Sequence, residues 1–311
     1  MLARVADSLY WMGRYIERTE HLARYLSVNY FNSLDAPHPI SKDRTFVMES
    51  MLFMMGSDEK NKSERNVLFK ATLDATSETS IITSLRNARE NARGSMDLIS
   101  TELWEAINKY YHFAKNYPME PLLRSGLDDF TTQVMEQCNI VKGKITGTLL
   151  HNDVYSFVLL GIHMERAIQI ARIISTKLND ANKILNSDTE IKNVSYEWTT
   201  LLKCTESFDM LKRYYKRFPD KKQTLEFLIL NNQCPRSISF CLSKIKNSID
   251  MLGIQKNPPK DSVSYFVGKV ASEYWYMNID EIEESLSSFI EKTVSTLDKI
   301  SKKLGDQYFQ Y

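Results

Sequence analysis

Glycine and proline are scarce in this chain, with ten and eight copies among 311 residues. A β-rich fold needs turn residues roughly every dozen positions, so this scarcity argues against sandwiches and barrels. No alternating strand pattern continues for more than four residues. Long runs of Leu, Ile, Glu, Lys, Arg and Met favour helices instead. We therefore predict an all-α fold, an elongated multi-helix bundle.

An excess of either charge is also missing, because 40 basic residues face 39 acidic ones. Such a balance gives no field that would attract nucleic acid or an anionic membrane. The apolar run Phe157–Ile162 has core length and falls far short of the ~20 residues of a membrane span. The chain enters a helical pattern directly, without the basic and apolar segments of a secretory signal. These absences predict a cytoplasmic protein without nucleic-acid or membrane partners.

Motifs for metal, nucleotide or nucleophilic chemistry are absent as well. The four cysteines, at positions 138, 204, 234 and 241, show no CxxC spacing and are typical of reduced, mostly buried thiols. A di-metal helix bundle needs paired E-x-x-H motifs, which the chain lacks. The segment Lys142–Thr148 does not fit a P-loop, and no G-x-S-x-G occurs. We predict no metal and no cofactor.

Apolar periodicity places the helices along the chain. The first long helix covers 4–33, and a proline-containing break follows it. Serine caps start a second long helix near 77–80, and Gly94-Ser95 bends or breaks it. The segment 66–73 is a short element of uncertain type. Further helices are predicted at 44–55, 101–114, 121–149, 153–179, 191–216, 220–231, 236–252, 258–277 and 280–304, with linkers at 179–188 and 253–259.

Two segments 148 residues apart share the pattern G-x-x-x-E-R-x-x-x-x-A-R. The first is "GRYIERTEHLAR", starting at Gly13, and the second is "GIHMERAIQIAR", starting at Gly161. Glycine inside a helix costs about 1 kcal/mol relative to alanine. Its presence at both starts predicts that another backbone or side chain passes close to each glycine.

A charged stripe borders the apolar seam of the first helix. It contains Gly13, Glu17, Glu20 and Arg24, about 100° around the helix from the seam. Glu20 and Arg24 can pair at i,i+4. Glu17 and Arg24 lie about 10 Å apart along the axis, too far to pair directly. Glu17 therefore needs a partner from another helix.

The helix after Ser80 carries a similar stripe of Arg86, Glu90, Arg93 and Asp97. If the three stripes converge, the carboxylates of three helices meet four arginines: Glu17, Glu90 and Glu165 with Arg24, Arg86, Arg93 and Arg172. The stripes have three interpretations that the sequence leaves open. They form a structural ion-pair network that fixes helix register, a groove whose arginines bind carboxylate or phosphate, or plain solvent-facing charge.

Four segments resemble the bacterial alpha-E domain family: "MLARVADSLYWMGRYIERTEHLARYL", "SLRNARENARGSMDLISTELWEAIN", "GIHMERAIQIARII" and "CPRSISFCL". The resemblance implies an all-α domain whose members occur beside circularly permuted ATP-grasp proteins and transglutaminase-like peptidases. These are the partners it implies here. Matching motif positions and the arginines of the repeat give the candidate charged cluster: Arg14, Glu17, Arg18, Glu20, Arg24, Arg86, Arg89, Glu90, Arg93, Glu102, Glu165, Arg166, Arg172 and Arg236. Trp104, Glu105 and Asn108 match as well.

The second repeat departs from the family pattern at two places. Gly161 is followed by Ile162 and His163 instead of Arg-Tyr, and Ile168 replaces an acidic residue. We therefore expect a weaker second site.

The chain is predicted to form a single domain of residues 1–311, with sub-halves 1–180 and 181–311. Its function is interpreted as that of a non-catalytic helical partner, or substrate holder, in an ATP-grasp-linked system that forms peptide or amide bonds. One alternative is an enzyme in which a helix-borne glutamate acts as general base between arginine clamps, and this requires a glutamate with a raised pKa. A further alternative is a purely structural ion-pair core. The missing histidine-base and nucleophile motifs favour the first hypothesis over the enzyme.

Overall fold

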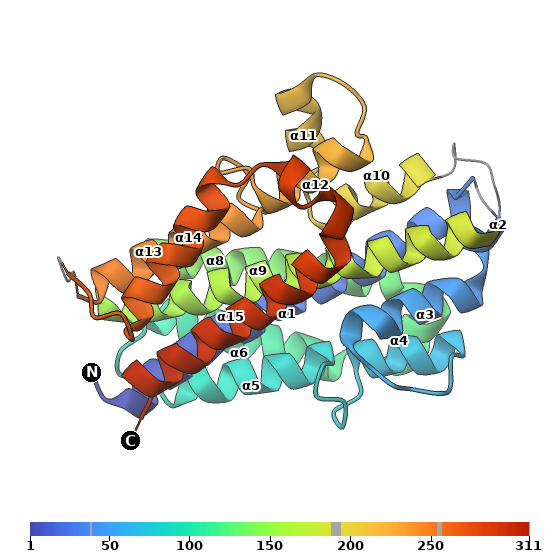
Figure 1. Cartoon of the computed structure of the whole chain (residues 1–311). Helices are drawn as coiled ribbons and strands as arrows, with labels where there is room; N and C mark the ends of the chain where they lie inside the picture. Colours follow the sequence, from blue (N-terminus) through green and yellow to red (C-terminus); the bar gives the residue numbers. More distant parts are fainter. Residues whose placement is uncertain (38, 188–193, 254–256, 311) are drawn as a thin grey trace.

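The computed structural model describes residues 1–37, 39–187, 194–253 and 257–310. Within these ranges the chain forms helices, turns and loops and no β-strand, which confirms the all-α prediction. The long helices lie roughly along one common axis, and both termini lie at the same end of the bundle (Figure 1). The helices are α1 Ala3–Asn32, α2 Pro39–Lys42, α3 Arg44–Met55, α4 Glu64–Thr72, α5 Ile81–Arg93, α6 Thr101–Asn116, α7 Met119–Pro121, α8 Leu127–Thr148, α9 Asp153–Ser187, α10 Val194–Cys204, α11 Phe208–Tyr215, α12 Lys221–Ile229, α13 Ile238–Met251, α14 Val263–Tyr276 and α15 Leu286–Tyr308.

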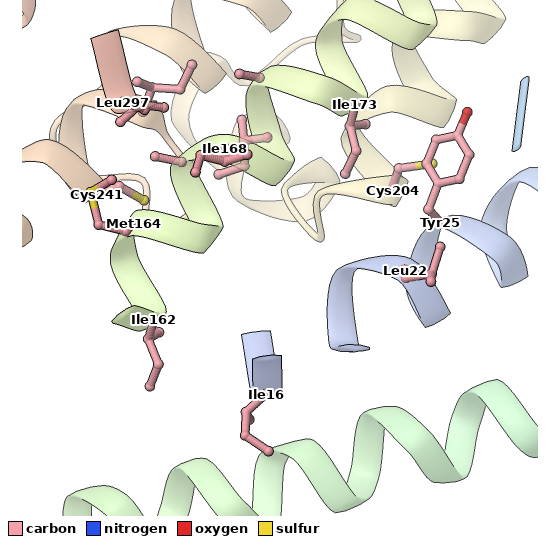
Figure 2. Close-up of a cluster of buried hydrophobic side chains, with 14 of the residues drawn as sticks. Ile16, Leu22, Tyr25, Ile162, Met164, Ile168, Ile173, Cys204, Cys241 and Leu297 are labelled. Atoms are coloured by element: carbon pink, nitrogen blue, oxygen red, sulfur yellow. The ribbon is translucent and has the colours of Figure 1, made fainter. Parts of the chain in front are cut away.

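Two helices, α1 and α9, form the centre of the bundle. α9 contacts α1, α3, α10, α13 and α15, whereas α1 also packs against α5 and α8. Because neighbours surround α9, apolar residues occur on nearly every side of it, and its sequence lacks a single apolar stripe. Figure 2 shows apolar side chains of α1, α9, α10, α13 and α15 in this core, which includes Ile16, Ile168, Cys204, Cys241 and Leu297.

The glycines of the repeat mark the crossing of α1 and α9. A Cβ atom added to Gly13 would lie 2.3 Å from the carbonyl oxygen of Val158, and one added to Gly161 would lie 2.0 Å from that of Tyr10. Each glycine therefore admits the backbone of the opposite helix. This confirms the prediction that something passes close to both positions.

Most predicted helices are confirmed within a few residues, and their caps explain the boundaries. The Ser80 hydroxyl accepts a hydrogen bond from the backbone N–H of Thr83 at 3.2 Å, as expected of an N-cap. The second helix breaks after Arg93, and a new helix starts at Thr101, after the N-cap Ser100, whose hydroxyl accepts a hydrogen bond from the backbone N–H of Leu103. The uncertain segment 66–73 lies in α4 and its C-cap.

Three predicted boundaries are wrong. The linker at 179–188 is helical as far as 187, because Asp180, Ala181 and Ile184 are buried and extend α9. The helix predicted at 191–216 divides into α10 and α11 at a break where Glu206 has a φ of 56°. The last helix starts at Leu286, after two 3₁₀ turns.

Some of the predicted segments are described only in part. Residues 188 and 191–193 lie outside the described residues, as does 254–256 of the linker at 253–259. The division of the domain after residue 180 falls within α9.

All four cysteines are buried and free, as the sequence predicts. Burial raises the pKa of each thiol.

Candidate functional site

The two Glu–Arg dipeptides of the repeat pair with each other across the α1–α9 crossing. The Arg18 guanidinium donates from Nε and Nη2 to Glu165, at 2.7 and 3.1 Å. Reciprocally, Arg166 donates from the same two nitrogens to Glu17, at 2.5 and 3.2 Å. Both glutamates are fully buried. These forked contacts use the planar geometry of arginine, and they supply the interhelical partner that Glu17 required.

Further charges surround Glu17 and form what we call the Glu17 cluster. Lys142 of α8 pairs with both Glu17 and Glu20. Arg236, just before α13, donates to Glu20 at 2.7 Å and also pairs with Glu17. Arg24 donates to Glu20 at 2.7 Å, which confirms the predicted i,i+4 pair. Three helices and the turn before α13 are therefore joined by one group of charges, which the exposed Glu206 completes through contacts with Arg24 and Arg236.

The buried glutamates are held in the ionised state. Burial alone would raise the pKa of Glu17, but the charges of Arg166 and Lys142 outweigh it and hold the pKa well below its ordinary value. The pKa of Glu165 is likewise lowered, because Arg18 and Arg14 overcome the effect of burial. A general base at these positions would need the opposite shift. His21, which contacts Glu17 at 3.1 Å, has a pKa lowered by burial.

The carboxylate of Glu165 is shared by more than one guanidinium. Arg14 donates to it from Nε at 2.8 Å, in addition to the fork from Arg18. Gln169, one turn along α9, donates its amide to the same carboxylate at 2.7 Å. One negative charge thus faces two positive ones, so the Glu165 side of the crossing carries excess positive charge.

A cavity of about 430 Å³ lies beside this second pair, and we call it the arginine cavity. Arg18 and Arg172 enter it from α1 and α9, and Arg86 enters it from α5. Glu78 is the one carboxylate among its lining residues. The remaining lining is aromatic, apolar or neutral polar: Trp11, Tyr15, Leu22, Met54, Met55, Thr79, Thr83, Asn87 and Gln169.

Arg172 lacks a counter-ion because of a difference between the repeats. Its counterpart, Arg24, pairs with Glu20 one turn earlier. The residue that corresponds to Glu20 is Ile168, whose side chain belongs to the apolar core (Figure 2). Arg172 is an exposed residue, and neighbouring protein atoms desolvate its guanidinium only in part, which lowers its pKa. Among the described residues, neither Arg172 nor Arg86 has an ion-pair partner within 4.0 Å.

Several candidates from the sequence lie outside this site. The prediction that Glu90 and Arg93 meet Glu17 and Glu165 is wrong, because both side chains are exposed on α5 and pair with each other at 2.6 Å. One turn of α5 separates this surface pair from Arg86, which does reach the arginine cavity. The stripe on α5 therefore points partly to the cavity and partly to solvent.

The family-motif residues of α6 form a separate group with Arg89. Its guanidinium donates to the Asn108 side chain at 2.7 Å, pairs with Glu90, and lies 5.7 Å from the centre of the Trp104 ring. Glu102 is exposed at the start of α6, and so is Glu105. None of these side chains lines the arginine cavity.

Other charged residues of the core were not predicted. Lys142 was considered only as part of a P-loop, although its position on α8 brings it to Glu17. Lys177 is buried and contacts Asn29 at 2.6 Å and Asp180 at 3.0 Å. Asn29 lies 148 residues before Lys177, so the repeat extended by one turn would have pointed to this contact.

Metal binding finds no support in the arrangement of side chains. In the part of the chain that the structure describes, no group of three or more His, Cys, Asp or Glu residues could hold a metal ion. Among the described helices, we also find no apolar segment that is long enough to span a membrane.

The fold and the site together define a class: an all-helical bundle in which duplicated Glu–Arg dipeptides pair across two central helices. Residues 1–309 match the family model of Alpha-E, described as a predicted alpha-helical domain with a conserved ER motif. The chain belongs to the Alpha-E family. It carries the ER dipeptide at Glu17, at Glu165 and, outside the crossing, at Glu64. Neither a curated protein nor a solved structure matches it.

Proposed function

We propose that this chain is a non-catalytic helical component of an ATP-grasp-linked system that forms peptide or amide bonds, and that it holds a carboxylate-bearing substrate in the arginine cavity. The proposal rests mainly on Arg172, an exposed guanidinium at the cavity that lacks a counter-ion within 4.0 Å among the described residues. In the first repeat Glu20 supplies the corresponding carboxylate. In the second repeat a ligand supplies it.

The chemistry of the cavity favours a carboxylate attached to an apolar group. The guanidinium plane presents paired donors that match the two oxygens of a carboxylate. Three arginines against Glu78 leave the lining with an excess of two positive charges. Trp11, together with the two methionines at 54 and 55, offers apolar surface for the remainder of the ligand. The volume of about 430 Å³ lies within the usual range for small-ligand sites.

The enzyme hypothesis has less support than the holder. It requires a buried glutamate that can accept a proton near neutral pH. Glu17, Glu20 and Glu165 each have a lowered pKa and are surrounded by cations. They serve better as fixed anchors than as bases, and Glu165 positions Arg18 at the cavity.

Isothermal titration calorimetry with N-acetyl-Ala-Leu-Ala tests the anion site. We expect the free-acid peptide to bind, and the same peptide with a C-terminal amide to bind at least tenfold more weakly. A hydrogen bond to a charged group contributes about 1.5–3 kcal/mol, so Arg172→Gln or Arg86→Gln should also weaken the acid at least tenfold. Arg93→Gln, an exposed arginine on the same helix as Arg86, is the matched control. Equal affinity for the free-acid peptide and the C-terminal amide would refute the proposal that the chain holds a carboxylate.

The association with an ATP-grasp protein is tested by affinity capture from native lysate. We expect mass spectrometry to find an ATP-grasp or transglutaminase-like protein enriched over a control bait. We expect the recovered chain alone to show no turnover of ATP. Failure to enrich either protein, or ATP turnover by the isolated chain, would contradict the proposed context.

A further inference from the structure

A second cavity adjoins the arginine cavity along α9. It has a volume of about 420 Å³ and shares two lining residues, Met54 and Arg172, with the first. One wall is α15, which packs on α9, and the other is the end of α3. The two cavities are therefore neighbours on either side of the Arg172 side chain.

The second cavity also carries acidic groups. Glu291 and Asp298 of α15 line it, seven residues apart and therefore on one face of the helix. Both side chains are exposed, and neither has an ion-pair partner within 4.0 Å in the ranges described. Ile290, Val294 and Phe53 give this cavity apolar lining as well.

Asp298 does not neutralise Arg172. It acts on that guanidinium through the electrostatic field, yet no pair of their charged atoms lies within 4.0 Å, and burial still lowers the pKa of Arg172. Asp298 therefore lies at the Arg172 end of the groove, and Glu291, seven residues earlier on α15, lies toward the other end.

We infer that the two cavities bind a single short peptide with free termini, its C-terminal carboxylate between Arg172 and Arg86 and its N-terminal ammonium at Glu291. This rests on the proposed function and adds the ligand's class and direction. A ligand with charge at both ends satisfies both sets of unpaired groups, whereas a simple anion satisfies one.

The dimensions fit a peptide of two to four residues. Seven helical residues separate Glu291 from Asp298, a span of about 10 Å. An extended peptide advances about 3.3–3.6 Å per residue, so three residues cover roughly that span. The flexible side chain of Met54 lies where the two cavities meet, so the groove can adapt to different central side chains.

The experiment compares three forms of Ala-Leu-Ala by calorimetry: free at both ends, N-acetylated, and C-amidated. We expect the free peptide to bind about fivefold more tightly than the acetylated one, since contacts to exposed carboxylates are modest. The variant Glu291→Gln should lose this preference and keep the affinity for the acetylated peptide. Glu284→Gln, an exposed acid outside the groove, should retain the preference.

The outcomes separate the two proposals. If acetylated and free peptide bind equally and both need the C-terminal carboxylate, the inference fails and the proposed holder stands. If the C-amide binds as well as the free acid, or no form binds the folded protein, both fail. Circular dichroism of each variant verifies that the helices are retained.

Discussion

Replacing Gly161 with alanine tests whether the α1–α9 crossing depends on backbone contact. The added Cβ atom would lie 2.0 Å from the carbonyl oxygen of Tyr10, whereas ordinary contact starts near 3.4 Å. The helices must therefore separate by more than an ångström, which also loosens the Arg18–Glu165 and Arg166–Glu17 forks. Overpacking costs about 1–3 kcal/mol or more, and helix propensity returns about 1 kcal/mol. With the ion pairs weakened as well, we expect a net loss of at least about 2 kcal/mol.

Urea denaturation followed by circular dichroism measures this loss. The matched control is Gly143→Ala on α8, because a Cβ atom there meets nothing within 4 Å. That control should gain about 0.5–1 kcal/mol from helix propensity alone. Gly13→Ala, with its Cβ 2.3 Å from the carbonyl oxygen of Val158, should behave like Gly161→Ala. If Gly161→Ala matched Gly143→Ala, the close crossing described here would be wrong.

Three other predictions concern the charges of the core. Glu17→Gln leaves buried cations without their carboxylate and should cost about 3–5 kcal/mol in urea denaturation; a loss below about 1 kcal/mol would contradict the network. Arg172→Gln removes a guanidinium that lacks a counter-ion, so stability should stay unchanged or rise, and a clear loss would mean that Arg172 has a structural partner. Burial lowers the pKa of His163 to about 3 and also lowers that of His21, so only the unfolded chain protonates them as the pH falls below 6.5. Stability should therefore be full above pH 6.5 and decline below it. The decline should steepen below pH 4.5, where the lowered pKa of Glu165 adds to it. Denaturation midpoints between pH 8 and pH 3 check this, and a flat profile would oppose it.

Helical periodicity was sufficient to predict most of the helices, because the apolar seam of each helix packs against another helix. It failed where tertiary contacts outweigh local signals. The sequence predicts a linker at Asp180, yet this residue is buried beside Lys177 and continues α9. The sequence predicts a helix at Glu206, yet the chain turns there, and its carboxylate pairs with Arg24 and Arg236.

The repeat located the centre of the site but could not assign its partners. The offset of 148 identified Glu17 and Glu165, and the glycines indicated close packing. Their pairing with Arg166 and Arg18 depends on how two helices cross, which a single sequence does not encode in its spacing. The stripe on α5 misled the prediction, because Arg86 and Glu90 share a stripe but only Arg86 reaches a cavity.

The close backbone packing at Gly13 and Gly161 also restricts how α1 and α9 can move relative to each other. A slip of α1 along α9 by one turn, about 5.4 Å, would drive side chains into both backbones and separate four buried charges at once. The two central helices, α1 and α9, therefore keep a fixed position relative to each other. Any closure around a bound molecule must come from the outer walls, α15 and the segment that leads into α5.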